Sequence, residues 1–198
     1  MNSRTDEAIV LRVRDYGESD SIVSLFTKGE GRLSGIAKWA KKSRKRFGAA
    51  LEIGACVHLV YDDHPHRDMV LLKEVNRLDL IQGWRSSWLS ITAASFALEL
   101  AAKLLPEKQQ ALQKYEVLEA FLKGLNEETL LPYLFDLQFR FLALSGWEPD
   151  FENCGICGHV LGGGEKASKR QGCFDHYWAH ILGKELVSRR LLNELFLV

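Results

Sequence analysis

A change in hydrophobic period near residue 80 divides this chain into two parts that need different secondary structure. Before it, apolar and polar residues alternate in short runs, which is the period of a strand with one buried face. After it, apolar residues recur every three to four positions, which is the period of a helix. The sequence therefore predicts an α+β protein with a strand domain over residues 1–80 and a helical domain over residues 81–198.

The first part contains five short runs rich in β-branched residues, at positions 8–14, 21–27, 32–39, 55–61 and 69–75. Turn-forming sequences such as DYGESD and KGEG separate them. Five strands in about 80 residues fit an OB fold, a five-stranded barrel that binds single-stranded nucleic acid on one face and its loops. An SH3-like barrel or an open antiparallel sheet would give the same pattern.

The second part has the pattern of helices separated by prolines and glycines. Apolar residues at helical spacing predict helices over residues 88–105, 112–125, 129–144 and 184–195. Pro132 falls in the first turn of the third helix, where a missing N–H costs little. That helix is apolar on nearly all sides, so we expect it at the centre of the helical domain.

Segment 153–180 carries four potential metal ligands at the spacing C-x2-C-x15-C-x2-H: Cys154, Cys157, Cys173 and His176. This is the spacing of a tetrahedral zinc site, in which we expect the second pair to return from a separate short loop. Four protein ligands leave no position for water, so the predicted cofactor is a structural Zn²⁺. His180 is an alternative fourth ligand.

Charge is distributed unevenly along the chain, although 26 basic and 26 acidic residues give a formal net charge of zero. Residues 28–47 contain eight basic residues and one acidic residue, which leaves a net charge of −7 on the remainder. A basic segment on an otherwise acidic protein predicts a surface for a polyanion.

The segment KWAKKSRKRFG, residues 38–48, is the strongest candidate site and is called the basic loop below. It holds six cations within nine residues, with Trp39 and Phe47 beside them. As a mobile loop it would pair with phosphates while an aromatic ring stacks on a base, without reading sequence. The alternative is a solvated loop with no ligand. Tyr16, Phe26 and Tyr61 are further stacking candidates or core residues.

The sequence indicates a protein that is not an enzyme. It has no nucleophile elbow, no phosphate-binding loop and no zinc-deaminase motif. A cluster of acids and histidines in one predicted hairpin leaves a metal-dependent nuclease as an alternative: Asp62, Asp63, His64, His66 and Asp68. No signal peptide or membrane-spanning run is visible, and the cysteines are spaced for metal, so we expect a cytoplasmic protein.

Two stretches resemble the RecO family of bacterial recombination-mediator proteins. Residues 7–54, EAIVLRVRDYGESDSIVSLFTKGEGRLSGIAKWAKKSRKRFGAALEIG, show the family's order of strands, Y-G-E-x-D turn and K-S-R-x-R-F loop. Residues 135–158, FDLQFRFLALSGWEPDFENCGICG, resemble the leucine-rich helix that runs into the family's zinc knuckle. The likeness spans nearly the whole chain.

The resemblance implies an N-terminal OB fold, a helical C-terminal domain with a zinc site, and a non-enzymatic role in DNA repair. It implies binding and annealing of DNA and, with the partner RecR, loading of RecA onto DNA coated with single-stranded-DNA-binding protein. A nucleoid-associated location follows. The DNA-contacting positions would be Arg32, Lys38, Lys41, Lys42, Arg44, Lys45 and Arg46, with Lys73 as a further one.

Two positions depart from the family pattern. Trp39 stands where a small residue is more usual in the family. The tryptophan would be either a platform for base stacking or a packing substitution. His176 stands where the fourth zinc ligand is commonly cysteine, while Cys154, Cys157 and Cys173 match the family.

The acidic helical domain is expected to bind protein partners, including the tail of single-stranded-DNA-binding protein. A groove for an acidic, apolar-ended peptide would be formed by Leu134, Leu137, Arg140, Phe141 and Leu144. The alternative is that the apolar members are core residues. A zinc-ribbon adaptor for transcription or RNA is the other non-enzymatic interpretation of a barrel joined to a cysteine cluster.

Overall fold

The computed structural model describes residues 3–43, 45–48, 50–64, 66–78, 83–147, 158, 167–183, 186–189 and 191–192. The chain forms two compact units. The first unit comprises Met1–Gln82 and Ala101–Glu119, and the second comprises Gly83–Leu100 and Ala120–Val198.

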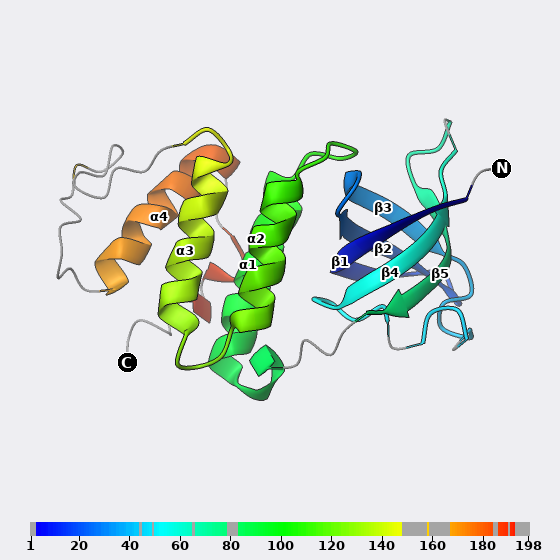
Figure 1. The fold of residues 1–198 in the computed structure, drawn as a ribbon, viewed down its shortest axis with the longest axis horizontal. Helices are drawn as coiled ribbons and strands as arrows, with labels where there is room; N and C mark the ends of the chain where they lie inside the picture. The colour runs from blue at the N-terminus through cyan, green and yellow to red at the C-terminus, as the bar shows by residue number, and fades with distance from the viewer. Residues whose placement is uncertain are drawn as a thin grey trace. The chain divides into compact units, whose positions relative to one another are not determined.

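Five strands form a closed barrel in the first unit (Figure 1). They are β1 (Ser3–Tyr16), β2 (Asp20–Thr27), β3 (Gly31–Ala37), β4 (Cys56–Asp62) and β5 (Val70–Arg77). The order around the barrel is β1-β2-β3-β5-β4, and only the β3–β5 pairing is parallel. All five predicted strands are confirmed, and the closed barrel is consistent with an OB fold.

Closure of the barrel depends on the length of β1, which pairs with both β2 and β4. Its first half, Ser3–Ile9, pairs with β4, and Ala8–Tyr16 pairs with β2. An irregularity between Val10 and Arg12 shifts the register between these halves, as a bulge does where a strand bends around a barrel. The alternation in β3 then places Leu33 and Ala37 inside.

The barrel interior is filled by aliphatic side chains and two buried aromatic rings, Phe47 and Tyr61. Phe47 comes from the connection between β3 and β4 and is only 1% exposed. Burial of a side chain of this size stabilises a fold by about 1.5–3 kcal/mol. The β3–β4 connection is therefore attached to the barrel core.

Asp62 joins three strands at one end of the barrel. Its side chain, 4% exposed, accepts a 2.6 Å hydrogen bond from the Ser3 hydroxyl of β1 and lies 3.0 Å from Lys73 Nζ of β5. The Ser3 hydrogen bond and the Lys73 ammonium hold the pKa of Asp62 below its usual value.

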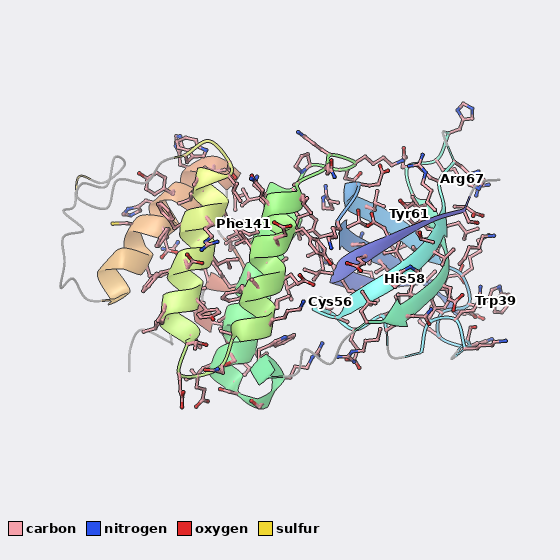
Figure 2. The ribbon with its side chains drawn as sticks, viewed as in Figure 1. Trp39, Cys56, His58, Tyr61, Arg67 and Phe141 are labelled. Carbon is pink, nitrogen blue, oxygen red and sulfur yellow. The ribbon has the colours of Figure 1, made fainter. Side chains whose placement is uncertain are left out.

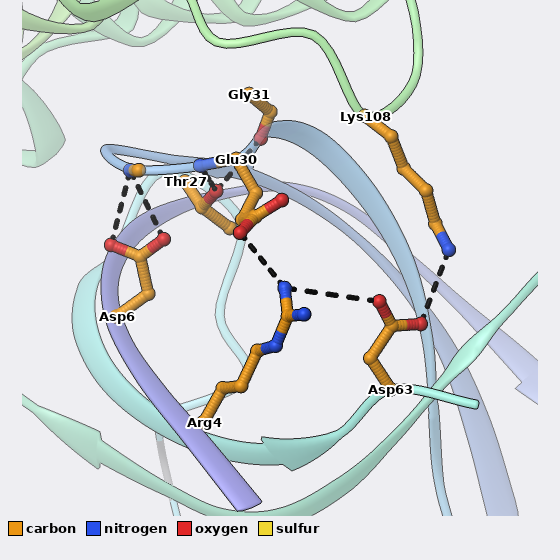
Figure 3. Close-up of polar contacts among 8 residues, drawn as sticks. Arg4, Asp6, Thr27, Glu30, Gly31, Asp63 and Lys108 are labelled. Carbon is orange, nitrogen blue, oxygen red and sulfur yellow. Dashed lines mark hydrogen bonds and ion pairs between the residues drawn. The ribbon is translucent and has the colours of Figure 1, made fainter. Parts of the chain in front are cut away.

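The segment that connects the first two helices packs on the barrel through paired charges. Arg4 contacts Glu30 at 2.9 Å and Asp63 at 4.0 Å, and Lys108 reaches Asp63 at 3.2 Å (Figure 3). Nearby, Gly31 has a φ of +76°, and a Cβ atom there would overlap the carbonyl oxygen of Gln109. Only glycine fits this position without displacing the backbone.

The helices are α1 (Trp88–Leu104), α2 (Leu112–Gly124), α3 (Leu130–Ala143) and α4 (Ala167–Leu182). The first three confirm the predicted helices, and a 3₁₀ turn, Gly83–Ser86, precedes them. The sequence did not predict α4, because its polar residues and cysteine spacing resemble a metal loop. Half of the residues of the helix predicted over 184–195 lie outside the described residues. No helix in the described part is long and apolar enough to cross a membrane.

A buried polar network joins α3 to α4 within the second unit. The amides of Gln138 and Gln171 donate to each other at 2.9 and 3.2 Å, and the Trp178 indole donates to Gln138 at 3.0 Å. Gln171 also donates to Asp175, whose pKa is raised by burial. A satisfied buried network favours a single packing arrangement, which sets the rotation of α4.

We expect Gly31→Ala to destabilise the barrel because it adds both left-handed strain and a clash with Gln109. The predicted loss is roughly 2–5 kcal/mol of unfolding free energy, measured by urea denaturation. Gly17→Ala is the matched control, because its φ of +60° is similar but no atom lies within 4 Å of the added Cβ. Its loss should be only about 1–2 kcal/mol. Equal losses would contradict the close-approach argument.

The lowered pKa of Asp62 predicts an acid-sensitive contribution to stability. This contribution is present above the pKa that Asp62 has in the unfolded chain, and it is lost as pH falls through the lower folded pKa. Asp62→Asn should therefore be less stable than the parent at pH 7, and this difference should be smaller at about pH 3, below the usual aspartate pKa of about 3.9. Urea unfolding at both pH values measures this. Glu18→Gln, in the β1–β2 turn, is the control and should change stability little.

Candidate nucleic-acid interface

The basic loop is tied to the barrel by its backbone. The Lys41 N–H donates to the Ser19 carbonyl at 3.1 Å, and the Val75 N–H of β5 donates to the Arg46 carbonyl at 2.9 Å. The Arg46 guanidinium also donates to the Lys38 carbonyl at 2.8 Å and to Ser43 Oγ at 3.0 Å. The expectation of a mobile loop is therefore wrong for the residues described, because these bonds and buried Phe47 hold it.

The predicted DNA-contacting cations differ in what they contact. Lys38 and Lys45 are exposed, and no described residue forms an ion pair with either. Lys42 is exposed and places Nζ 5.5 Å from the centre of the Trp39 ring. Lys41 lies 2.9 Å from the exposed carboxylate of Asp15. Arg44 lies outside the described residues.

Two of the predicted cations are paired with groups of the fold. Arg32 donates to the Leu105 carbonyl at 2.8 Å and lies 3.4 Å from Glu107. Lys73 pairs with the nearly buried carboxylate of Asp62. Their charges are largely neutralised by these partners, so they are weaker candidates for phosphate binding than Lys38 and Lys45.

The aromatic candidates separate clearly by burial. Phe47, Phe26 and Tyr61 are buried, so the expectation that Phe47 could stack on a base is wrong in this structure. Tyr16 is 52% exposed and Trp39 is 56% exposed. Trp39 lies on the outer side of the barrel, on the basic loop (Figure 2). Its exposure argues against the packing substitution, and the stacking platform stays a prediction.

Three residues that the sequence did not single out contribute to this surface. The Asp20 carboxylate accepts the Trp39 backbone N–H at 2.8 Å. Asn76 and Arg77 join Lys45 and Phe47 in lining a small open pocket. Asp20 ends the Y-G-E-x-D turn, but its contact with Trp39 could not be predicted from that motif, because the contact depends on which loop folds beside β2.

The hairpin of acids and histidines does not form a metal site among the described residues. Asp62 is engaged by Ser3 and Lys73, and Asp63 lies near Arg4 and Lys108. No group of three or more histidine, cysteine, aspartate or glutamate side chains is placed to hold a metal in that part of the chain. These ion pairs give the two carboxylates a structural role.

Two of the four predicted zinc ligands lie within the described residues. Cys154 and Cys157 lie outside the described residues. Cys173 and His176 lie on α4, so the expectation of a short loop for this pair is wrong. Three residues apart on a helix, they share one face, as zinc ligands on a helix do. Cys173 is only 5% exposed, whereas His176 is exposed. The centroids of the His180 and Trp147 rings lie 5.4 Å apart.

Most of the residues predicted to form a peptide groove lie in the interior of the helical unit. Leu134, Leu137 and Phe141 are buried, and Leu144 is partly buried. Arg140 is exposed and lies 2.9 Å from Asp136, one helical turn away. This burial agrees with the alternative that the apolar members are core residues. A peptide would have to displace their present neighbours to reach them.

Two family models together match most of the chain. The N-terminal model of recombination protein O matches residues 1–81, and its C-terminal model matches residues 85–193. The boundary between them lies close to the change in hydrophobic period.

Three similar proteins are named DNA repair protein RecO. The chain is 39% identical to the protein of Syntrophotalea carbinolica, 36% to that of Syntrophobacter fumaroxidans and 36% to that of Geobacter metallireducens. These matches cover 80%, 81% and 81% of the chain, but only 62%, 64% and 66% of the relatives. With both family models matched in order, the chain belongs to the RecO family.

Proposed function

We propose that this protein is a non-enzymatic recombination mediator that binds single-stranded DNA through the basic loop and anneals complementary strands. The observation that carries the proposal is the concentration of exposed cations on one side of the barrel. Lys38, Lys42 and Lys45 have no ion pair with any described residue, in a protein whose formal net charge is zero.

The mechanism rests on charge neutralisation. Two single strands repel each other, and cations that displace their counterions lower this repulsion without reading bases. The basic loop is preorganised by its bonds to β5 and to the β1–β2 turn, so little ordering is needed on binding. Cations carried by a preorganised loop favour contact with the DNA backbone and therefore annealing of any sequence.

We assign the wider role from family membership. With RecR, the protein would help to load RecA onto DNA coated with single-stranded-DNA-binding protein, whose tail would contact the helical unit. Arg140, the exposed cation of the predicted groove, would meet an acidic tail at its surface. The proposed location is the cytoplasm, at the nucleoid.

We also propose a structural Zn²⁺ held by Cys154, Cys157, Cys173 and His176. The donor chemistry fits, because thiolate and imidazole ligands are those of closed zinc sites. Cys173 and His176 lie one turn apart on α4, whose rotation is set by the Gln138–Gln171 pair. His176 is preferred to His180, whose ring already packs against Trp147. When bound, the ion would fasten segment 153–166 to this helix.

Removal of Lys38 and Lys45, two of the three lysines that form no ion pair with a described residue, tests the proposed DNA site. Lys38→Ala/Lys45→Ala should weaken binding to single-stranded DNA and lower the slope of log affinity against log salt by about 1.4, because each phosphate contact contributes about 0.7. Binding is measured by fluorescence anisotropy across a salt series. The same variant should slow annealing of strands coated with single-stranded-DNA-binding protein.

Lys123→Ala/Arg140→Ala is the charge-matched control, because both cations lie on helices outside the barrel. This control variant should leave the slope of log affinity against log salt unchanged. An unaltered slope in the Lys38/Lys45 variant would remove the basic loop from the DNA site. Normal annealing by that variant would show that the loop does not drive the reaction.

Metal analysis tests the zinc proposal. The purified protein should contain one Zn²⁺ per chain, and chelation should lower its thermal stability because metal binding is coupled to folding. His176→Ala should weaken zinc affinity in a competition assay with a chelator, whereas His180→Ala should not. A metal-free protein of equal stability would contradict the proposal, and the opposite ranking of the two histidines would reassign the ligand.

A further inference from the structure

Trp39 is held in an unfavourable backbone conformation that leaves its side chain in solvent. Its φ is +60°, in the left-handed region that bulky residues rarely adopt. Strain of this kind persists where surrounding bonds enforce it, and it is common at binding sites. The indole is 56% exposed, although burial would be the favourable outcome for so large an apolar surface.

Hydrogen bonds from both sides enforce this conformation. The Trp39 N–H donates to Asp20 Oδ1 at 2.8 Å, which attaches it to the start of β2. Its carbonyl accepts the N–H groups of Lys42 and Ser43 at 3.1 and 2.9 Å, which closes a tight turn. Asp20 thus fixes the point from which the indole projects.

The surroundings of the indole identify its ligand. Lys38, Lys41 and Lys42 lie within three residues of it, and Lys42 Nζ is 5.5 Å from the ring centre. An exposed aromatic ring beside several lysines suits a ligand that carries both negative charges and planar rings. Single-stranded nucleic acid has both properties, whereas the bases of a duplex already stack on one another.

We infer that Trp39 stacks on a base of single-stranded DNA, and that Asp20 is a positioning residue that presents the indole. This inference rests on the proposed function of the basic loop. It adds a preference for single strands over duplexes, which phosphate contacts alone do not supply.

Substitutions of Trp39 test the stacking contact. The probes are a thymidine-only single strand and a mixed-sequence duplex of equal length. Trp39→Ala should bind the single strand about tenfold more weakly at an unchanged salt slope, with duplex binding little altered. Trp39→Phe should keep most of the affinity. Trp88→Phe is the matched control, because Trp88 is also exposed, at 58%, but lies on α1 in the helical unit.

A spectroscopic readout separates stacking from a structural role. Stacking on a base should quench tryptophan fluorescence when the single strand binds. The parent and Trp88→Phe should show this quenching, and Trp39→Phe should lose it while still binding. Quenching retained in Trp39→Phe would overturn the inference, as would parental single-strand affinity in Trp39→Ala.

A pair of Asp20 variants tests the positioning role. Asp20→Asn and Asp20→Ala remove the same charge, but only asparagine keeps an oxygen that can accept the Trp39 N–H. Asp20→Ala should bind the single strand several-fold more weakly than Asp20→Asn, with equal duplex binding and equal urea stability as the check on folding. Equal single-strand affinities would overturn the positioning role.

The outcomes for Lys38→Ala/Lys45→Ala keep the two proposals distinct. If that variant loses salt-dependent affinity while Trp39→Ala binds like the parent, the basic loop binds DNA through charge alone and the stacking inference fails. If the lysine variant keeps the parental salt slope, the proposed DNA site itself fails.

Discussion

The parallel pairing of β3 with β5 is the constraint on which the proposed DNA-binding surface depends. Because β5 lies between β3 and β4 in the barrel, the chain cannot turn directly from β3 into β4. Residues 38–55 must instead pass β5, where the Val75 N–H bonds to the Arg46 carbonyl. Phe47 enters the core along this path. The described part of this long connection is thereby attached to the barrel surface.

Exposure and pairing, rather than charge alone, separate binding residues from structural ones in this barrel. Lys73 and Arg32 carry the same charge as Lys38 and Lys45, yet the first two satisfy a nearly buried carboxylate and a backbone carbonyl. A buried carboxylate such as Asp62 requires a partner, because an uncompensated charge in the interior is costly. The barrel therefore pairs some of its cations with its own groups, and the proposed DNA site uses others that have no ion pair with a described residue.

The helical unit uses polar contacts in a comparable way. Gln138 and Gln171 satisfy each other inside the unit, which sets the face of α4 that turns inward. Buried amides that found no partner would be strongly destabilising, so this pairing limits the ways in which α3 and α4 can pack. The same constraint decides which side of α4 presents Cys173 and His176. The affinity of this helix for a metal would therefore depend on the packing of Gln138 and Gln171, which are not predicted ligands.

The sequence by itself determined the elements: the five strands of the barrel, the first three of the helices α1–α4 seen among the described residues, the position of the basic loop and the family. Hydrophobic period and local turn residues carry that information, because each depends on neighbours within a few positions. It missed α4, since the buried Gln171 and Trp178 of this helix contact Gln138 of α3, which is far away in the sequence. Only the tertiary structure decided that Phe47 is core and Trp39 is exposed, although the two aromatics flank the same cations. Their difference arises from long-range contacts, the barrel interior for Phe47 and the Asp20 carboxylate for Trp39, and local sequence does not encode such contacts.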